Sequence, residues 1–185
     1  LFGYAGRLFG YQRPQQPPSA LPQSGYFRLG DGENRMIIDC GPVIPPYQPG
    51  HTHCDMLSYE LALDGRPIVV DTGVYDYEPS AERALSRSTR AHNTVGVDGA
   101  EQSEVWGVFR VARRARPCLA ELASQAGQGG RFVGELEGFP LVAGRIRHRR
   151  EVVYEPPAVW RVDDRISGSG SHDVDSWIHL HPDWS

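Results

Sequence analysis

The sequence predicts an all-β fold, an antiparallel β-sandwich, and three observations lead to that prediction. Short apolar runs recur along the chain from about residue 25 onward. Turn dipeptides such as Asp64-Gly65 and Asp98-Gly99 separate neighbouring runs. Segments with helical character are few and short. Many short strands joined by tight turns bury their apolar faces when two antiparallel sheets pack against each other.

The expected strands are runs in which β-branched and aromatic residues are common. Their ranges are 26–29, 35–39, 57–63, 67–70, 94–97, 105–111, 131–136, 141–146, 151–154, 159–162 and 176–180. Helical character is expected only for residues 79–88 and 119–124. The last expected strand stops close to Ser185, which leaves open whether the sheet continues past that residue.

The first 24 residues differ in composition from the remainder of the chain. They are rich in glycine, proline and glutamine, and Pro14, Pro17, Pro18 and Pro22 favour extended backbone. We therefore expect residues 1–24 to be a linker and residues 25–185 to form one domain. The chain has 185 residues, which is long enough to bury a hydrophobic core of its own.

The overall composition excludes several classes of protein. A hydrophobic fraction of 39% and a charged fraction of 23% are typical of a folded soluble domain. The net charge of −4 gives no reason to expect a nucleic-acid partner, and no run approaches the roughly 20 apolar residues of a membrane-spanning helix. All 19 basic residues are arginine, whose planar fork suits carboxylate and sulfate groups. Three cysteines are too few for a disulfide framework.

The residues between 50 and 99 carry the chemistry. His51 and His53 are two residues apart, and in a strand such residues face the same side. Asp71 follows the apolar run 67–70, and His92 precedes the run 94–97. Two neutral imidazoles and one carboxylate are a common ligand set for zinc. The plainer alternative is that an isolated His-X-His belongs to an ordinary half-exposed strand.

A second metal-binding alternative is a cupin, a small β-barrel enzyme or sensor. Cupins also begin their metal site with a glycine and a His-X-His pair. A glutamate follows four or five residues later, a position that is occupied here by Leu57 or Ser58. A bound metal held by three histidines and a glutamate would favour this alternative.

Two strings resemble the heparinase II/III-like family of polysaccharide lyases. They are HTHCDMLSYELALDGRPIVVDTGVYDY at 51–77 and RSTRAHNTVGVDGAEQSEVWGVFR at 87–110. The resemblance extends over about residues 24–115, and WIHLHPD at 177–183 is similar to the family again. It implies a supersandwich-like β-sandwich in which His53, Asp71 and His92 bind a zinc ion that is mainly structural. His51 matches the histidine that this family directs toward the substrate, and it is therefore the expected catalytic residue.

The reaction implied by the resemblance is β-elimination on an acidic polysaccharide that contains uronic acid. Further catalytic residues of the family come from an α/α-toroid domain that precedes the sandwich, so we expect the present chain alone to be inactive. The resemblance also implies a periplasmic or secreted protein whose targeting segment is outside this chain. A carbohydrate-binding or interface module without catalytic activity is the remaining alternative, and a homo-oligomer stays open.

Four residues near these motifs are candidates for binding the polysaccharide. Tyr75 could stack on a sugar ring, although aromatic residues at strand spacing more often pack against protein. Arg87 and Arg90 could bind uronate or sulfate, or could be ordinary solvated arginines. Asn93 lies beside His92 and could fix a turn or support the metal site instead.

Overall fold

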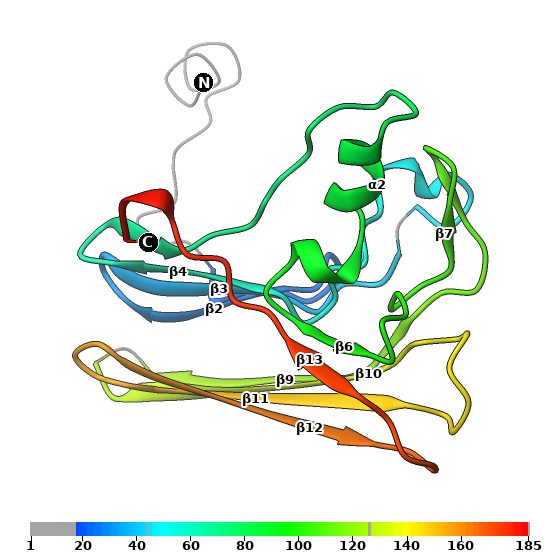
Figure 1. Ribbon diagram of the computed structural model, residues 1–185. Helices are drawn as coiled ribbons and strands as arrows, with labels where there is room; N and C mark the ends of the chain where they lie inside the picture. The colour runs from blue at the N-terminus through cyan, green and yellow to red at the C-terminus, as the bar shows by residue number, and fades with distance from the viewer. Residues whose placement is uncertain (1–17, 44, 126, 185) are drawn as a thin grey trace.

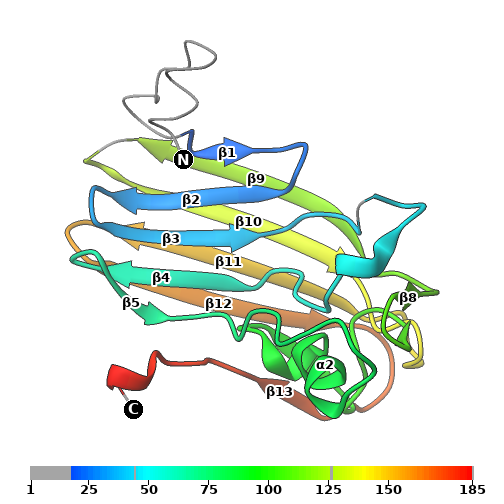
Figure 2. The same ribbon diagram turned by 90° about the horizontal axis from the view of Figure 1, so that it is seen from above.

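The computed structural model describes residues 18–43, 45–125 and 127–184. Their two larger sheets are antiparallel and pack face to face, and few residues are helical (Figure 1). Seen from above, the strands of the first sheet run roughly along those of the second (Figure 2). This arrangement is that of an aligned β-sandwich. The predicted fold class is confirmed.

The first sheet contains five strands in the spatial order β1-β2-β3-β4-β5. Their bounds are Ala20–Leu21, Tyr26–Asp31, Asn34–Asp39, Tyr59–Leu63 and Arg66–Val69. The turn between β4 and β5 is the predicted Asp64-Gly65 pair, with φ angles of 49° and 75°. Two successive positive φ angles match the twist of a two-residue hairpin, and glycine adopts them without steric cost.

The second sheet contains four longer strands in the spatial order β12-β11-β10-β9. Their bounds are Arg116–Gln125 for β9, Gly129–Glu137 for β10, Arg147–Glu155 for β11 and Val159–Ser167 for β12. The register is continuous between β11 and β12. It shifts once between β10 and β9, beside Leu136.

The hydrophobic core fills the space between the two sheets. Every second residue of β2 and β3 points inward and meets every second residue of β10 and β11, as the two-residue period of a strand requires. These buried residues are Phe27, Leu29, Met36, Ile38, Phe132, Leu136, Val152 and Tyr154. The rings of Phe27 and Phe132 lie with centroids 5.0 Å apart. Burial of this apolar surface is the main force that holds the layers together.

Smaller elements gather at one end of the sandwich, on the right of Figure 1. They are helix α2 (Ala81–Ser86), the paired strands β7 (Val105–Trp106) and β8 (Arg110–Val111), and the 3-10 turns η1 (Pro49–His51) and η2 (Thr89–Ala91). Strand β6 (Val95–Val97) pairs with β13 (Val174–Ser176), and η3 spans Pro182–Trp184. The predicted helix at 79–88 is thus present but shorter, and Ser80 caps it by accepting a hydrogen bond from the Arg83 amide.

Several predicted elements are wrong or only partly right. Residues 119–124, expected to be helical, belong to β9, because pairing with β10 along most of that strand outweighs a weak helical tendency. Residues 141–146 are not a strand but a turn, in which Gly144 and Arg145 both have positive φ. The run 105–111 is split into β7 and β8 by a turn at Gly107. In the run 176–180, β13 ends at Ser176 and only Leu180 bridges to Val69.

The predicted linker, residues 1–24, is described only in part. Residues 1–17 lie outside the described residues, so that portion of the prediction is untested. Ala20 and Leu21 form β1, which pairs with Phe27 and Tyr26 at the edge of the first sheet. The chain has therefore joined the sandwich by residue 20.

Candidate functional site

The site is built from loops at the end of the first sheet where α2 packs. His51 ends η1 and is exposed, whereas His53 lies in the following loop and is only 8% exposed. The predicted arrangement of both histidines on one strand is therefore wrong. They nevertheless border a common cavity of about 190 Å³, together with Asp55. Asp71 follows β5, and His92 follows η2 and is 1% exposed.

The three predicted metal ligands lie close together. The rings of His53 and His92 have centroids 5.3 Å apart, and Oδ2 of Asp71 lies 2.6 Å from Nδ1 of His92. One potential ligand atom each from His53, Asp55 and His92 lies within 4.8 Å of the other two. Asp55 was not among the residues predicted from the sequence. Its spacing of two residues from His53 repeats the spacing that joins His51 to His53, and that repeat could have identified it.

The protonation properties of this cluster suit a divalent cation. Burial, followed by the nearby charges of His92 and Arg83, lowers the pKa of His53 to about 4, so its imidazole is neutral at pH 7. Burial acts to lower the pKa of His92, but hydrogen bonding to Asp71 and the charges of Asp55 and Asp71 outweigh it and raise the pKa. Nε2 of His92 is buried and has no hydrogen-bond partner among the described residues. A cation at that nitrogen would replace its proton and satisfy an otherwise unpaired atom.

A buried arginine contacts His53 and the backbone just before the His-X-His motif. Nη1 of Arg83 lies 3.0 Å from Nε2 of His53, and Nη2 donates to the Gly50 carbonyl at 3.0 Å. Because a guanidinium only donates, Nε2 of the neutral His53 ring accepts this bond and Nδ1 carries the proton. A cation bound at Nε2 would take the place of this contact with Arg83. The guanidinium carbon of Arg83 also lies 4.9 Å from the centre of the Tyr77 ring.

His51 is held by Tyr77 at the surface of the site. Nδ1 of His51 lies 3.1 Å from the Tyr77 hydroxyl, and the two rings meet edge to face with centroids 5.3 Å apart. Tyr77 in turn stacks on Phe109 at a centroid distance of 6.3 Å. His51 is therefore oriented by one hydrogen bond while its ring remains accessible to a ligand.

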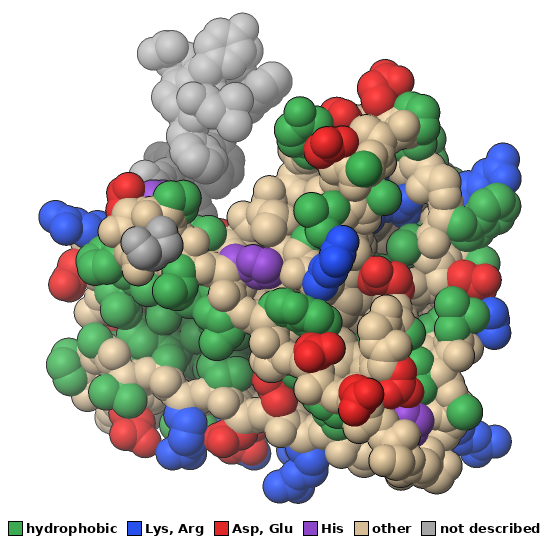
Figure 3. Space-filling view, in the orientation of Figure 1, with side chains coloured by type: hydrophobic (Ala, Val, Ile, Leu, Met, Phe, Trp, Pro, Cys, Tyr) green, Lys and Arg blue, Asp and Glu red, His purple; other side chains and the backbone are tan. Residues whose placement is uncertain are grey.

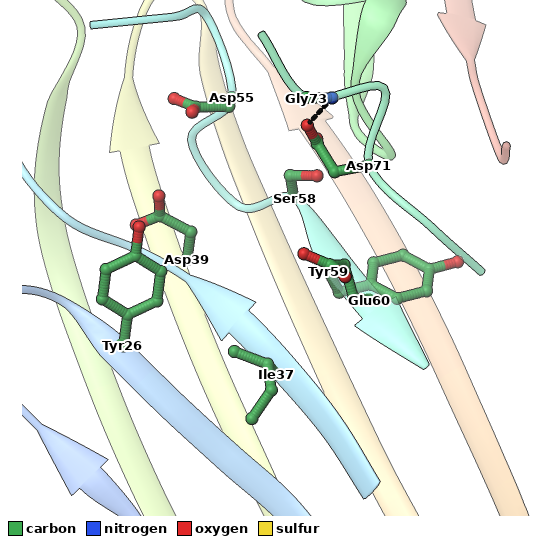
Figure 4. Close-up of a pocket in the computed structure, with 9 residues that line it drawn as sticks. All are labelled: Tyr26, Ile37, Asp39, Asp55, Ser58, Tyr59, Glu60, Asp71 and Gly73. Carbon is green, nitrogen blue, oxygen red and sulfur yellow. Dashed lines mark hydrogen bonds between the residues drawn. The ribbon is translucent and has the colours of Figure 1, made fainter. Parts of the chain in front are cut away.

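A larger cavity of about 340 Å³ adjoins this cluster and has an acidic wall, as Figure 4 shows. Four carboxylates line it: Asp39, Asp55, Glu60 and Asp71. Burial, and next the charge of Asp55, raises the pKa of Asp39 to about 7. The charge of Asp39 is in turn the main cause that raises the pKa of Tyr26 to about 12. So many carboxylates repel an anionic ligand unless a cation offsets their charge.

Two of the predicted polysaccharide-binding residues are buried and occupied by protein contacts. Arg87 donates to the carbonyls of Thr52, Gly107, Val108 and Arg110, which ties the His-X-His loop to the β7–β8 hairpin. The Asn93 amide donates to the Tyr59 and Val70 carbonyls and accepts from the His179 amide. Both side chains are therefore engaged by backbone groups of the protein itself.

The other two predicted residues are exposed. Tyr75 is 72% exposed in the loop after Asp71, where a sugar ring could stack on it. Arg90 lies instead beside a separate cavity of about 550 Å³, together with Trp177 and Glu101. Figure 3 shows acidic and basic side chains interspersed over one face of the described part of the molecule, without a continuous basic patch.

Fold and site together define an antiparallel β-sandwich with a candidate metal centre beside a surface cavity. The chain belongs to the family described as heparinase II/III-like, C-terminal, which matches residues 13–185. Membership in this family makes the cupin alternative wrong. No curated protein sequence matches the chain.

Solved structures of similar fold agree with this family. A mutant of the heparan sulfate lyase HepC from Pedobacter heparinus has a TM-score of 0.74 and 20% identity, covering 97% of this chain and 29% of that one. The heparinase III BT4657 gene product has a TM-score of 0.64 and 23% identity, covering 87% and 24% of the two chains. A further heparinase III has a TM-score of 0.64 and 18% identity, covering 90% and 25%. The present chain thus spans about a quarter of the length of these proteins.

The helices of the described residues are all short. None of them has the length and apolar character needed to cross a membrane.

Proposed function

We propose that this chain is the zinc-binding β-sandwich domain of a polysaccharide lyase that cleaves uronic-acid-containing glycans by β-elimination. The observation that carries the proposal is the position of His51. His51 is exposed and lines a cavity that His53 and Asp55 also line, and these two residues form the candidate metal cluster together with His92. The family membership and the lyases of similar fold support the same reaction class.

The proposed reaction breaks two bonds and forms one double bond. A base removes the proton α to the uronate carboxylate, a carbon–carbon double bond forms, and the glycosidic carbon–oxygen bond breaks. The departing oxygen takes up a proton. The difficult step is stabilising the enolate-like charge that develops on the carboxylate. His51 can take part either by accepting the proton or by donating a hydrogen bond to that charge, and Tyr77 fixes its ring for either role.

Zinc would be held by His53 and His92 together with Asp71, Asp55 or both. When bound, it would supply positive charge and hold the loops that border the cavity. That charge would offset the acidic wall formed by Asp39, Asp55, Glu60 and Asp71, so that an anionic sugar could approach. Neutral imidazole and carboxylate are ligands that zinc prefers, and a structural site of this kind stabilises the fold.

The further length of the similar structures suggests a partner domain. We propose that a helical toroid domain of the same polypeptide faces the sandwich and contributes the remaining catalytic groups, and that the complete protein is periplasmic or secreted. The substrate would then lie between the two domains, with His51 and Tyr75 on the sandwich side. A glycan-binding or interface role without catalysis is the second candidate function. The absence of lyase activity in the complete protein would favour it.

The experiment compares the complete polypeptide with the present chain on heparan sulfate, heparin and alginate. The ultraviolet absorbance of unsaturated uronate ends reports β-elimination. We expect turnover of at least one polymer by the complete protein and none by the present chain alone. His51→Ala in the complete protein should lower kcat by about 100-fold or more, because a positioned acid–base group contributes that much. Absence of unsaturated products with all polymers would contradict the proposed reaction.

A further inference from the structure

A buried ion pair in the second sheet extends across the core toward the two loops that carry the candidate metal ligands Asp55 and His92. Arg150 of β11 and Asp164 of β12 are register partners, and Arg150 is 1% exposed. Nε and Nη2 of Arg150 donate to Oδ1 and Oδ2 of Asp164, each at 2.7 Å. His148 lies on the same side of the strand, with Nε2 2.7 Å from Oδ1 of Asp164. Both oxygens of Asp164 are thus occupied, and the guanidinium is locked in one orientation.

The remaining nitrogen of Arg150 contacts both loops that carry the candidate metal ligands. Nη1 donates to the Leu57 carbonyl at 2.6 Å and to the Asn93 carbonyl at 2.6 Å. Leu57 lies two residues after Asp55, and Asn93 directly follows His92. One planar group on the second sheet therefore fixes the separation between two loops of the opposite layer.

The backbone at Leu57 shows why such a contact is needed. Leu57 has a φ of 62°, a left-handed conformation that side chains other than glycine rarely adopt. The amide of Gln102 pairs with both backbone groups of Met56 beside it, which restrains the same loop from the other side. With Met56 held by Gln102 and Leu57 by Arg150, the path of the chain after Asp55 is determined.

Stability alone does not explain this arrangement. The burial of two charges costs about as much as their attraction returns, and well-packed apolar residues often stabilise a protein equally well. A role in holding the two loops in position fits the geometry better. The planar guanidinium group can bind a carboxylate through two of its nitrogens and two carbonyls through the third.

We propose that Arg150, oriented by Asp164, is a positioning residue of the metal centre: it sets the distance between Asp55 and His92 and thereby the affinity for zinc. This inference rests on the metal binding proposed above. It assigns a role in metal binding to the second sheet, which itself contributes none of the candidate ligands.

The test measures the zinc dissociation constant of the purified chain by competition with a chromophoric chelator. The variants are Arg150→Lys, Arg150→Met and Asp164→Asn. Val152→Ala is the matched control, because Val152 is fully buried on the same strand and its side chain has no group that can donate a hydrogen bond to either loop. Arg150→Lys retains the positive charge yet cannot bind the carboxylate and both carbonyls at once.

We expect zinc affinity to fall by about 10-fold or more in Arg150→Lys, as for other groups that support metal ligands. Asp164→Asn should show a smaller decrease, and Val152→Ala should stay within about threefold of the parent.

The melting temperature, measured with and without zinc, separates positioning from a loss of stability. A positioning role predicts that zinc raises the melting temperature less in Arg150→Lys than in the parent, whereas Val152→Ala retains the full increase. If Arg150→Met fails to fold, Arg150→Lys and Asp164→Asn still decide the question. Parent-like affinity in both would overturn the inference alone. A parent protein that binds no zinc would overturn the proposed metal site as well.

Discussion

Nδ1 of His92 lies 2.6 Å from Oδ2 of Asp71, and Nε2 of the same ring is buried without a hydrogen-bond partner among the described residues. A histidine that binds metal through one nitrogen commonly donates its other N–H to a carboxylate. The pair therefore has the arrangement of a metal-binding histidine with its orienting group. Asp71 holds the His92 ring through this contact, and it is not one of the three residues, His53, Asp55 and His92, whose ligand atoms lie within 4.8 Å of one another.

Substitution of His92 tests whether this ring binds the metal. His92→Ala should remove bound zinc and lower the melting temperature, since metal binding and loop folding are coupled and the loss is several kcal/mol. The measurement is elemental analysis of protein purified without added metal, followed by thermal unfolding. His51→Ala is the control, because His51 is exposed and should leave zinc content intact. A normal zinc content in His92→Ala would contradict the assignment.

The two carboxylates of the site can be separated by conservative substitution. Asp55→Asn should weaken zinc binding by about tenfold or more, because Asp55 lies with His53 and His92 in one compact group. Asp71→Asn should weaken it also, since it removes the charge that faces Nδ1 of His92. Chelator competition at pH 7 measures both. An Asp55→Asn protein with parent affinity would restrict the carboxylate role to Asp71.

The stability of the protein after metal removal should depend on pH through His53. The pKa of His53 is lowered to about 4 in the folded protein, whereas an unfolded histidine has a pKa of about 6.5. Between these values the unfolded chain binds more protons, so stability falls as the pH falls from about 6.5 toward 4. Between pH 7 and 4.5 the His53 contribution to this loss should be about 2–3 kcal/mol.

Urea unfolding of EDTA-treated protein at pH 7 and pH 4.5 measures this effect. The matched variant is His53→Gln, which lacks the titrating group, so its stability should decline less over the same interval. Subtracting the variant from the parent removes contributions from other groups, among them Asp39. A difference that is equal at both pH values would show that His53 does not titrate as expected.

Asn93 should act on stability rather than on substrate affinity. Its amide makes three hydrogen bonds to backbone groups in the interior, so Asn93→Ala should cost about 2 kcal/mol or more. Arg90→Ala, an exposed change three residues earlier, should stay within about 0.5 kcal/mol of the parent. Chemical denaturation compares the two. Equal stability of Asn93→Ala and the parent would mean that these hydrogen bonds contribute nothing.

The sandwich and most of its strands were predictable, because apolar residues alternate with polar ones and turn dipeptides separate the runs. The failures have physical causes. Residues 119–124 combine good helix formers with spaced leucines, but pairing with β10 decides their structure. Residues 141–146 look apolar enough for a strand, yet Gly144 and Arg145 turn the chain. Neither effect can be read from local sequence alone.

The candidate site was predictable in its histidines and Asp71, because each occurs in a motif at the boundary of an element. Asp55 was not identified, because only the folded loop brings its carboxylate close to both His53 and His92. Arg87 was expected at the surface, but its burial depends on the β7–β8 hairpin, which closes over it. The contact of Arg150 with Asn93 joins residues 57 positions apart, and only the packing of the two sheets brings them together.

Anomalous diffraction at the zinc absorption edge, from crystals of the chain purified without added metal, would locate zinc bound at this cluster. We expect a single strong peak about 2.0–2.2 Å from a nitrogen of His53, a nitrogen of His92 and at least one oxygen of Asp55 or Asp71. A zinc-saturated crystal with no peak among these residues, or with its main peak elsewhere, would contradict it.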